Sequence, residues 1–308
     1  MTTPAFDAGP TLGALLIGTL ISCILWGIGA VQVYGYYSRF PEDRLAIKAT
    51  VAFVCLCETA HITCVMHTLY SWLVTDYGHP ERLMERPPPS VLGFIFLTVV
   101  IAVYVQLFFS YRIYVLSSSL VIPSLATLLS VARFALGMTI FGVGFRIASL
   151  SEYVAKWDKL ALAIWSLSAA EDVLITATLV FLLWRQRAQD STTGQTAILL
   201  DKIIMWTIET GLLTSTFSLA MLVCFHLMSN NFVWIAMFTI EARLFANSLF
   251  ASLNSRTVLR QARSGNLSGS GEPLSTFDAD APFTVSHATA SGGSIELDSV
   301  QRGKGDSA

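Results

Sequence analysis

The chain has 308 residues, of which 54% are hydrophobic and only 13% are charged. Soluble domains carry about 25% charged residues, so this composition excludes an ordinary water-soluble domain and predicts a surface that faces lipid. The net charge of −2 provides no strong basic field, so we expect the lipid bilayer as a partner and no nucleic acid.

Seven apolar runs follow one another along the chain. A helix that crosses a bilayer needs about 20 mostly apolar residues, and in lipid a helix satisfies its own backbone hydrogen bonds. The first run should be retained, because its leader lacks basic residues and the run exceeds a signal-peptide core. The predicted fold is all-α, a polytopic membrane bundle over residues 12–256. Its seven transmembrane helices are predicted at Leu12–Tyr34, Ile47–Leu73, Val91–Tyr111, Leu120–Phe145, Leu160–Trp184, Ile203–Met228 and Phe232–Leu253.

The two ends of the chain differ from this apolar region. Residues 1–11 form a short hydrophilic N-terminus, and residues 257–308 are rich in Ser, Gly, Thr and Asp. A segment of that composition cannot bury enough apolar surface to offset its ordering entropy. We therefore expect residues 257–308 to be a disordered tail, available to a cytosolic partner.

Arginine and lysine are divided unevenly between the two sides of the predicted bundle. Short cytosolic loops are enriched in these residues. One side holds Arg39, Arg44, Lys48, Arg112, Arg185, Arg187, Lys202, Arg256, Arg260 and Arg263, whereas the other holds Arg82, Arg86, Arg146, Lys156 and Lys159. The richer side predicts a cytosolic C-terminus and an extracellular N-terminus, in the plasma membrane rather than an internal one.

Polar side chains inside the apolar runs are the candidate functional residues. Ionisable groups in a bilayer are costly and usually face the bundle interior. The candidate binding layer comprises Glu58, His61, Arg133, Asp172, Glu209, Glu241, Arg243 and Asn247. Acidic groups outnumber basic ones, which favours a central polar cavity for a small molecule, a cation or a proton. Structural ion pairs that tie helices together would produce the same pattern, and both interpretations stay open.

Four phrases in the same region resemble a known family. They are Gln106-Leu-Phe-Phe-Ser-Tyr-Arg-Ile-Tyr114, Glu171-Asp172, Thr207-Ile-Glu-Thr-Gly211 and Asn247-Ser-Leu-Phe-Ala-Ser-Leu-Asn-Ser-Arg256. Over about residues 15–256 the chain resembles a fungal family of integral membrane proteins, abundant in mushroom-forming basidiomycetes and catalogued as a domain of unknown function. The resemblance implies a seven-helix membrane protein and implies no particular activity.

Two non-enzymatic functions fit these features. Seven helices with an outside N-terminus and a Ser-rich cytosolic tail have the layout of a receptor-like sensor, although layout alone is a weak argument for function. A layer of acidic groups within the bilayer equally suits a proton- or cation-coupled transporter or channel for small solutes. Ligand-dependent coupling to a cytosolic partner would distinguish the first, and flux across liposomes the second.

Enzymatic functions find less support. A zinc hydrolase needs three ligands in fixed geometry, and the intramembrane histidines form no H-x-x-x-H or H-E-x-x-H pair. An intramembrane hydrolase would therefore have to use a triad of His61, His226 and Asp172. Retinal would need a lysine within a helix, but Lys48 and Lys202 lie at run ends. We therefore expect no enzyme activity, no metal and no cofactor.

Overall fold

The computed structural model describes residues 8–79, 82–83, 87–146, 150–189, 194–228 and 231–256. Contacts divide the chain into residues 1–267 and 268–308, and every described residue belongs to the first unit. The predicted tail, 257–308, lies outside the described residues, as do residues 1–7.

Within the described ranges the chain forms seven α-helices, each long and apolar enough to cross a membrane. A π-helical turn, η1 (Gly9–Gly13), leads into the first helix, and a second, η2 (Ser71–Thr75), continues the second helix. The predicted all-α bundle with seven transmembrane helices is confirmed. The helices are α1 (Ala14–Arg39), α2 (Leu45–Tyr70), α3 (Pro89–Ser117), α4 (Val121–Gly144), α5 (Leu150–Gln189), α6 (Gly194–Leu227) and α7 (Val233–Asn254).

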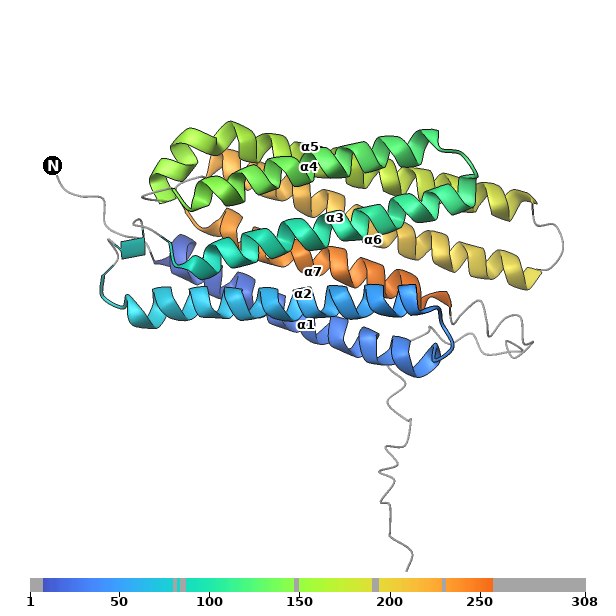
Figure 1. Ribbon diagram of the computed structural model, residues 1–308, viewed down its shortest axis with the longest axis horizontal. Coiled ribbons are helices and arrows are strands. Elements are labelled where there is room, and N and C mark those ends of the chain that lie inside the picture. Colours follow the sequence, from blue (N-terminus) through green and yellow to red (C-terminus); the bar gives the residue numbers. More distant parts are fainter. Residues whose placement is uncertain are drawn as a thin grey trace, which may run out of the picture. The chain divides into compact units, whose positions relative to one another are not determined.

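Successive helices run antiparallel, as the ribbon in Figure 1 shows. The ends of α1, α3, α5 and α7 therefore lie at one end of the bundle, here called the C-terminal face. The starts of the same helices, with η1 and η2, lie at the opposite end, here called the N-terminal face.

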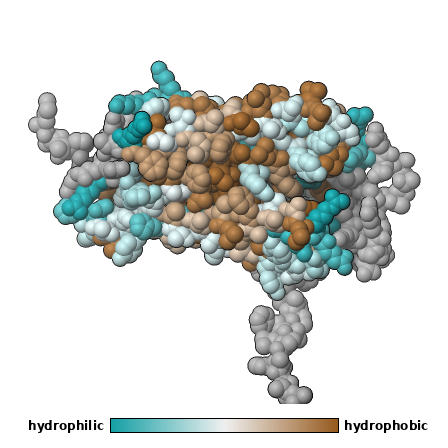
Figure 2. Space-filling view, viewed as in Figure 1, coloured by the Kyte–Doolittle hydropathy of each residue, from teal (hydrophilic) through white to brown (hydrophobic). Residues whose placement is uncertain are grey.

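The outer surface of the bundle is apolar. Large hydrophobic side chains such as Ile24, Leu56 and Leu128 are 65%, 71% and 64% exposed. Figure 2 shows hydrophobic residues across the middle of the visible face, with most hydrophilic residues toward its two ends. Such a belt is the surface that hydrocarbon chains solvate, so this is a multi-pass membrane protein.

Helix α7 lies at the centre of the bundle. In its most apolar stretch 78% of the residues are buried, against 44% or less in the other six described helices. The remaining helices bury only part of their circumference because lipid covers the rest. Helix α7 therefore offers polar side chains to several neighbours at once, which matters for the site.

Two helices are longer than the hydrophobic runs predicted. Helix α5 begins at Leu150 and α6 begins at Gly194, about ten residues before their apolar runs. Hydropathy measures the length of helix in hydrocarbon, whereas a helix can continue into water with polar residues. At the C-terminal face Arg187 and Asp201 form an ion pair of 2.8 Å between these two helices, beyond the apolar core.

Candidate functional site

Two charged side chains of α7 point to different sides of that helix. Glu241 and Arg243 are both buried, and Arg243 has no exposed surface. Residues two positions apart are separated by about 200° around an α-helix. Each charge therefore meets a different set of neighbours, and the buried polar residues fall into two groups.

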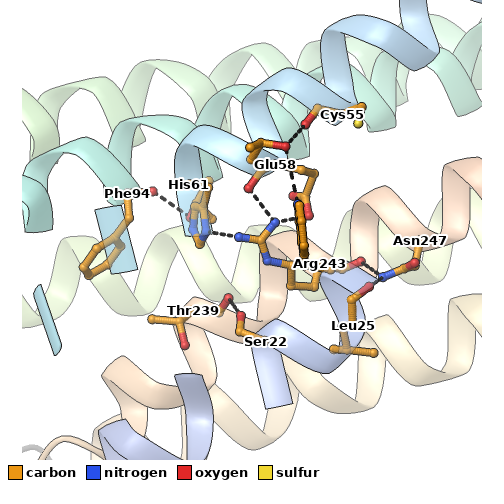
Figure 3. A network of polar contacts seen from close by, with 12 residues as sticks. Ser22, Leu25, Cys55, Glu58, His61, Phe94, Thr239, Arg243 and Asn247 are labelled. Atoms are coloured by element: carbon orange, nitrogen blue, oxygen red, sulfur yellow. Dashed lines mark hydrogen bonds and ion pairs between the residues drawn. The ribbon is translucent and has the colours of Figure 1, made fainter. Parts of the chain in front are cut away.

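The first group, here called the Arg243 network, joins α2, α3 and α7. Arg243 donates from Nη1 to a carboxylate oxygen of Glu58, and to the Glu58 backbone carbonyl at 2.9 Å. Its Nη2 contacts Nδ1 of His61 at 2.7 Å, and Nε2 of His61 contacts Oγ1 of Thr98 at 2.9 Å. Figure 3 shows Arg243 reaching from α7 toward Glu58 and His61 on α2.

The hydrogen bonds of this network have a single consistent direction. Arginine only donates, so Nδ1 of His61 accepts from Arg243 and the ring hydrogen lies on Nε2. Nε2 then donates to Thr98, whose hydroxyl donates to the carbonyl of Phe94 at 2.9 Å. Every step is buried, so the network fixes the side-chain positions of three helices relative to one another.

Helix α1 is attached to α7 by side chains that bond to backbone carbonyls. Ser22 donates to the carbonyl of Thr239 at 2.7 Å, and Asn247 donates to that of Leu25 at 3.1 Å (Figure 3). Near the C-terminal face Asn254 donates to the carbonyl of Gln32 at 2.9 Å. In lipid such bonds, together with small residues at the seam, replace the hydrophobic drive for helix association.

The second group, here called the Arg133 cluster, joins α3, α4, α5 and α7. Its members are all buried. Arg133 donates from Nη2 to Glu241 at 3.0 Å and lies over the Phe245 ring at 5.2 Å. The remaining contacts run from Ser130 to Glu171 and, at 3.4 Å, from Nε2 of Gln106 to Asp172.

The described part of the bundle has more buried carboxylates than buried arginines. Glu58 pairs with Arg243, and Glu241 pairs with Arg133. Glu171 and Asp172 accept hydrogen bonds only from the neutral side chains of Ser130 and Gln106 among the contacts given above. In each, the second carboxylate oxygen is buried and has no protein partner. Buried carboxylates in this position are normally neutral, hydrated or bound to a ligand.

An apolar chamber lies toward the N-terminal face. Its walls come from η2, α3, α4, α5 and α7, and the space between them, counted out to the open side, is about 910 Å³. Sites for small molecules are mostly apolar, as this lining is. The chamber is lined by Trp72, Pro87, Val91, Leu92, Phe94, Ile95, Val99, Gly137, Ile140, Gly144, Ala161, Ile164, Trp165, Trp234, Ile235 and Phe238.

A second cavity, here called the threonine-lined cavity, lies between α3, α5, α6 and α7. The space between its walls, counted out to the open side, is about 390 Å³. It shares no lining residue with the apolar chamber, and two members of the Arg133 cluster, Gln106 and Asp172, form part of its wall. The full lining is Gln106, Phe109, Asp172, Ile175, Thr176, Leu179, Thr207, Thr210, Gly211, Thr214, Phe245 and Ser248.

Seven of the eight candidate residues lie in these buried contacts. Glu58, His61 and Arg243 belong to the Arg243 network, and Asn247 adjoins it by donating to the backbone carbonyl of Arg243 at 2.9 Å. The Arg133 cluster contains Arg133, Asp172 and Glu241. Glu209 is different, because its side chain is exposed on α6. His226 is also exposed, whereas His61 and Asp172 are buried. Within the described ranges no group of three metal-binding side chains occurs.

Sequence reasoning missed several neutral members of the two groups. Thr98, Gln106 and Ser130 are each at most 1% exposed. Thr98 bonds His61 and Gln106 bonds Asp172, whereas Ser130 bonds Glu171, which is not one of the eight candidates. An isolated glutamine inside an apolar run is a detectable signal. Threonine and serine are common in membrane helices, where they bond their own backbone, so Thr98 and Ser130 carried no such signal.

The fold and the buried ionic groups define a seven-helix membrane protein. Residues 168–258, which include all of α6 and α7 and the second half of α5, match a family of unknown function (DUF6534). The predicted resemblance to a domain of unknown function is confirmed over these residues; the fungal origin and the longer extent stay predictions. Neither the curated proteins nor the solved structures contain a match.

Proposed function

We propose that this protein is a receptor-like sensor that binds an apolar small molecule in the apolar chamber. The observation that carries the proposal is the chamber itself. It is lined by aromatic and aliphatic side chains, and its surface has too few polar atoms to suit a hydrophilic ligand. The ligand would be held by close packing against these apolar side chains, because lipid already removes the hydrophobic drive.

The chamber lies beside an ionic contact that a ligand can perturb. Gly137 and Phe238 line the chamber. Arg133 precedes Gly137 by four residues on α4, and Glu241 follows Phe238 by three on α7, about one helical turn in each case. A ligand that shifts α4 relative to α7 therefore changes the geometry of the 3.0 Å ion pair. A conformational response requires such a difference in contacts between two states.

Contacts of α7 at the C-terminal face provide the output in this proposal. Arg112 of α3 donates to Ser252 at 2.6 Å, and Arg256 pairs with Asp43 in the loop between α1 and α2. Arg256 also lies over the ring of Phe40 at 4.6 Å. Movement of α7 would alter this surface, where we propose that a cytosolic partner binds.

Filling the chamber should abolish ligand binding. We expect Ala161→Phe to remove the thermal stabilisation that an apolar ligand gives to the purified wild-type protein. Saturating ligand adds about 2.7 kcal/mol at a hundredfold excess over Kd, which corresponds to several degrees in Tm. The measurement is a thermal-shift screen of farnesol, dodecanol and related apolar alcohols in detergent micelles.

Ala163→Phe is the matched control, because Ala163 is exposed two residues along the same helix. It should retain the full shift. Hydrogen exchange of residues 107–118 and 250–256 should also change on binding, because the proposed output surface lies there. Equal shifts in all three proteins would indicate partitioning into the micelle and would overturn the proposal.

Transport is the second candidate, and the order of the two cavities favours it. On α7 Phe238 lines the apolar chamber and Phe245 the threonine-lined cavity, with Glu241 between them. On α5 Trp165 and Asp172 stand in the same order. A solute path would then pass the Arg133–Glu241 pair. Proton flux into proteoliposomes that contain a pH-sensitive dye would favour transport over sensing.

We further propose that the N-terminus is extracellular, the C-terminus is cytosolic and the membrane is the plasma membrane. The C-terminal face carries Arg39, Arg44, Lys48, Arg112, Arg185, Arg187 and Arg256 among the described residues, as the positive-inside rule requires of a cytosolic face. The predicted tail, with Asn266, would then be cytosolic.

The glycosylation site of the tail tests this orientation. We expect Asn266, in the sequon Asn266-Leu267-Ser268, to stay unmodified in eukaryotic cells, because glycosylation occurs on the extracytoplasmic side. Protease added to intact cells should remove a tag at the N-terminus and spare one at the C-terminus. A glycosylated Asn266 would place the tail outside and contradict the receptor-like proposal.

A further inference from the structure

The wall of the threonine-lined cavity presents hydrogen-bond acceptors. Oδ2 of Asp172 and Oε1 of Gln106 are buried without a protein partner, and their residues are 6% and 1% exposed. An unpaired buried polar atom costs about 1–3 kcal/mol. Asp172 and Gln106 both line this cavity, so a donor group bound there could complete their hydrogen bonding.

Four of the five hydroxyl groups in the described lining, those of Thr207, Thr210, Thr214 and Ser248, already donate their hydrogens to backbone carbonyls. Thr210 donates to the carbonyl of Trp206 at 2.8 Å, Thr214 to Gly211 at 3.1 Å, and Ser248 to Phe245 at 2.7 Å. What these hydroxyls retain for a ligand is oxygen lone pairs. The described wall therefore suits a ligand that donates several hydrogen bonds.

The charge of the cavity favours a cation. Asp172 is the one ionisable residue in the described lining, and Arg133, the nearest basic member of its cluster, pairs with Glu241. The remaining wall is uncharged; it combines hydroxyl and amide groups with apolar side chains, among them the aromatic rings of Phe109 and Phe245. Aromatic faces attract organic cations, whereas a bare metal ion requires a shell of about six oxygens.

We propose that the threonine-lined cavity binds a small organic ammonium ion, with its –NH₃⁺ group between Asp172 and Gln106 and its carbon atoms against Phe109 and Phe245. This site is separate from the apolar chamber and does not depend on the proposed sensor function.

Benzylammonium is a suitable probe, and benzyl alcohol is its neutral counterpart of similar size. Binding to the full-length protein in nanodiscs would be measured by isothermal titration calorimetry at pH 7, in phosphate buffer without other amines. We expect saturable binding of one benzylammonium per chain, at least tenfold tighter than benzyl alcohol. Sodium chloride at the same concentration should not compete.

Asp172→Asn should weaken benzylammonium binding at least tenfold and leave the weak binding of benzyl alcohol unchanged. Glu209→Gln is the matched control, because it removes an exposed carboxylate from α6 and should leave the affinity unchanged. If Asp172→Asn fails to fold, the comparison of the two probes on the wild-type protein decides. Equal affinity for both probes, competition by sodium, or no saturable binding of benzylammonium would each overturn the proposal.

Discussion

Replacing Arg243 with alanine should destabilise the helix bundle by about 3–5 kcal/mol, the usual cost of removing one partner of a buried ion pair. Arg243 has no exposed surface and bonds both Glu58 and His61. Its loss leaves the Glu58 carboxylate buried without a cation and removes the donor to Nδ1 of His61. The expected fall in Tm is about 10 °C for a domain of this size, measured by circular dichroism in detergent micelles.

Arg256→Ala is the matched control for this variant. Arg256 also forms an ion pair, with Asp43, but its side chain is 33% exposed at the C-terminal face. Ion pairs in contact with water contribute about 0–1 kcal/mol, so the loss should be much smaller. A result in which Arg243→Ala melts like Arg256→Ala would show that the Arg243 network is not a main support of the bundle.

A double variant separates the cost of an unpaired charge from the value of the pair. Replacing a complete buried ion pair by apolar side chains of similar volume is often neutral. Glu58→Leu combined with Arg243→Met should therefore recover most of the stability that Arg243→Ala loses. Failure to recover would mean that the bonds to His61 and the Glu58 carbonyl matter more than the charge.

The seven helices could be predicted because hydrocarbon imposes a fixed length on each apolar run. The ends of α5 and α6 could not be predicted in this way. Their first turns at Leu150 and Gly194 lie outside the apolar runs, where helical structure depends on local sequence. For α6 it also depends on contacts with α5 such as that of Asp201 with Arg187. Hydropathy contains no information about that part of the helix.

Individual site residues could be predicted, but their pairing could not. Ionisable residues are rare in membrane helices, so Arg133 and Glu241 stand out in the sequence. Helical spacing tells which residues share a face of one helix. It does not tell which helix packs against that face, and the Arg133–Glu241 contact joins residues 108 positions apart. The acidic surplus favoured a polar cavity, but the positions and linings of the two cavities depend on how side chains of several helices pack, so they could not be predicted.

Glu209 illustrates the limit of assuming that every carboxylate in an apolar run faces inward. It follows Ile203, where the run begins, by six residues, which corresponds to about 9 Å along the helix. It is therefore closer to the bilayer surface than Glu58 and Asp172, which lie 11 and 12 residues inside their runs. Helix α6 turns Thr207, Thr210 and Thr214 toward the threonine-lined cavity, and Glu209 is exposed.

An alanine at position 18 should separate α1 from α7. A Cβ atom added to Gly18 would lie 2.7 Å from Cβ of Ala236 and 2.9 Å from its Cα and backbone oxygen. Backbone atoms cannot rotate away, so the helices must move apart. We expect Gly18→Ala to cost about 1–3 kcal/mol, the usual penalty for overpacking, measured by thermal unfolding.

Gly27→Ala provides the control on the same helix, because its added Cβ would meet no atom within 4 Å. Alanine is favoured over glycine inside a helix by up to about 1 kcal/mol, so this variant should be neutral or slightly more stable. The Ser22–Thr239 bond lies one turn from Gly18 and should lengthen in Gly18→Ala, so that hydrogen exchange near Thr239 and in α1 becomes faster. If both variants have the same stability and exchange, close contact between α1 and α7 is not what attaches α1, and the bonds from Ser22, Asn247 and Asn254 must be sufficient on their own.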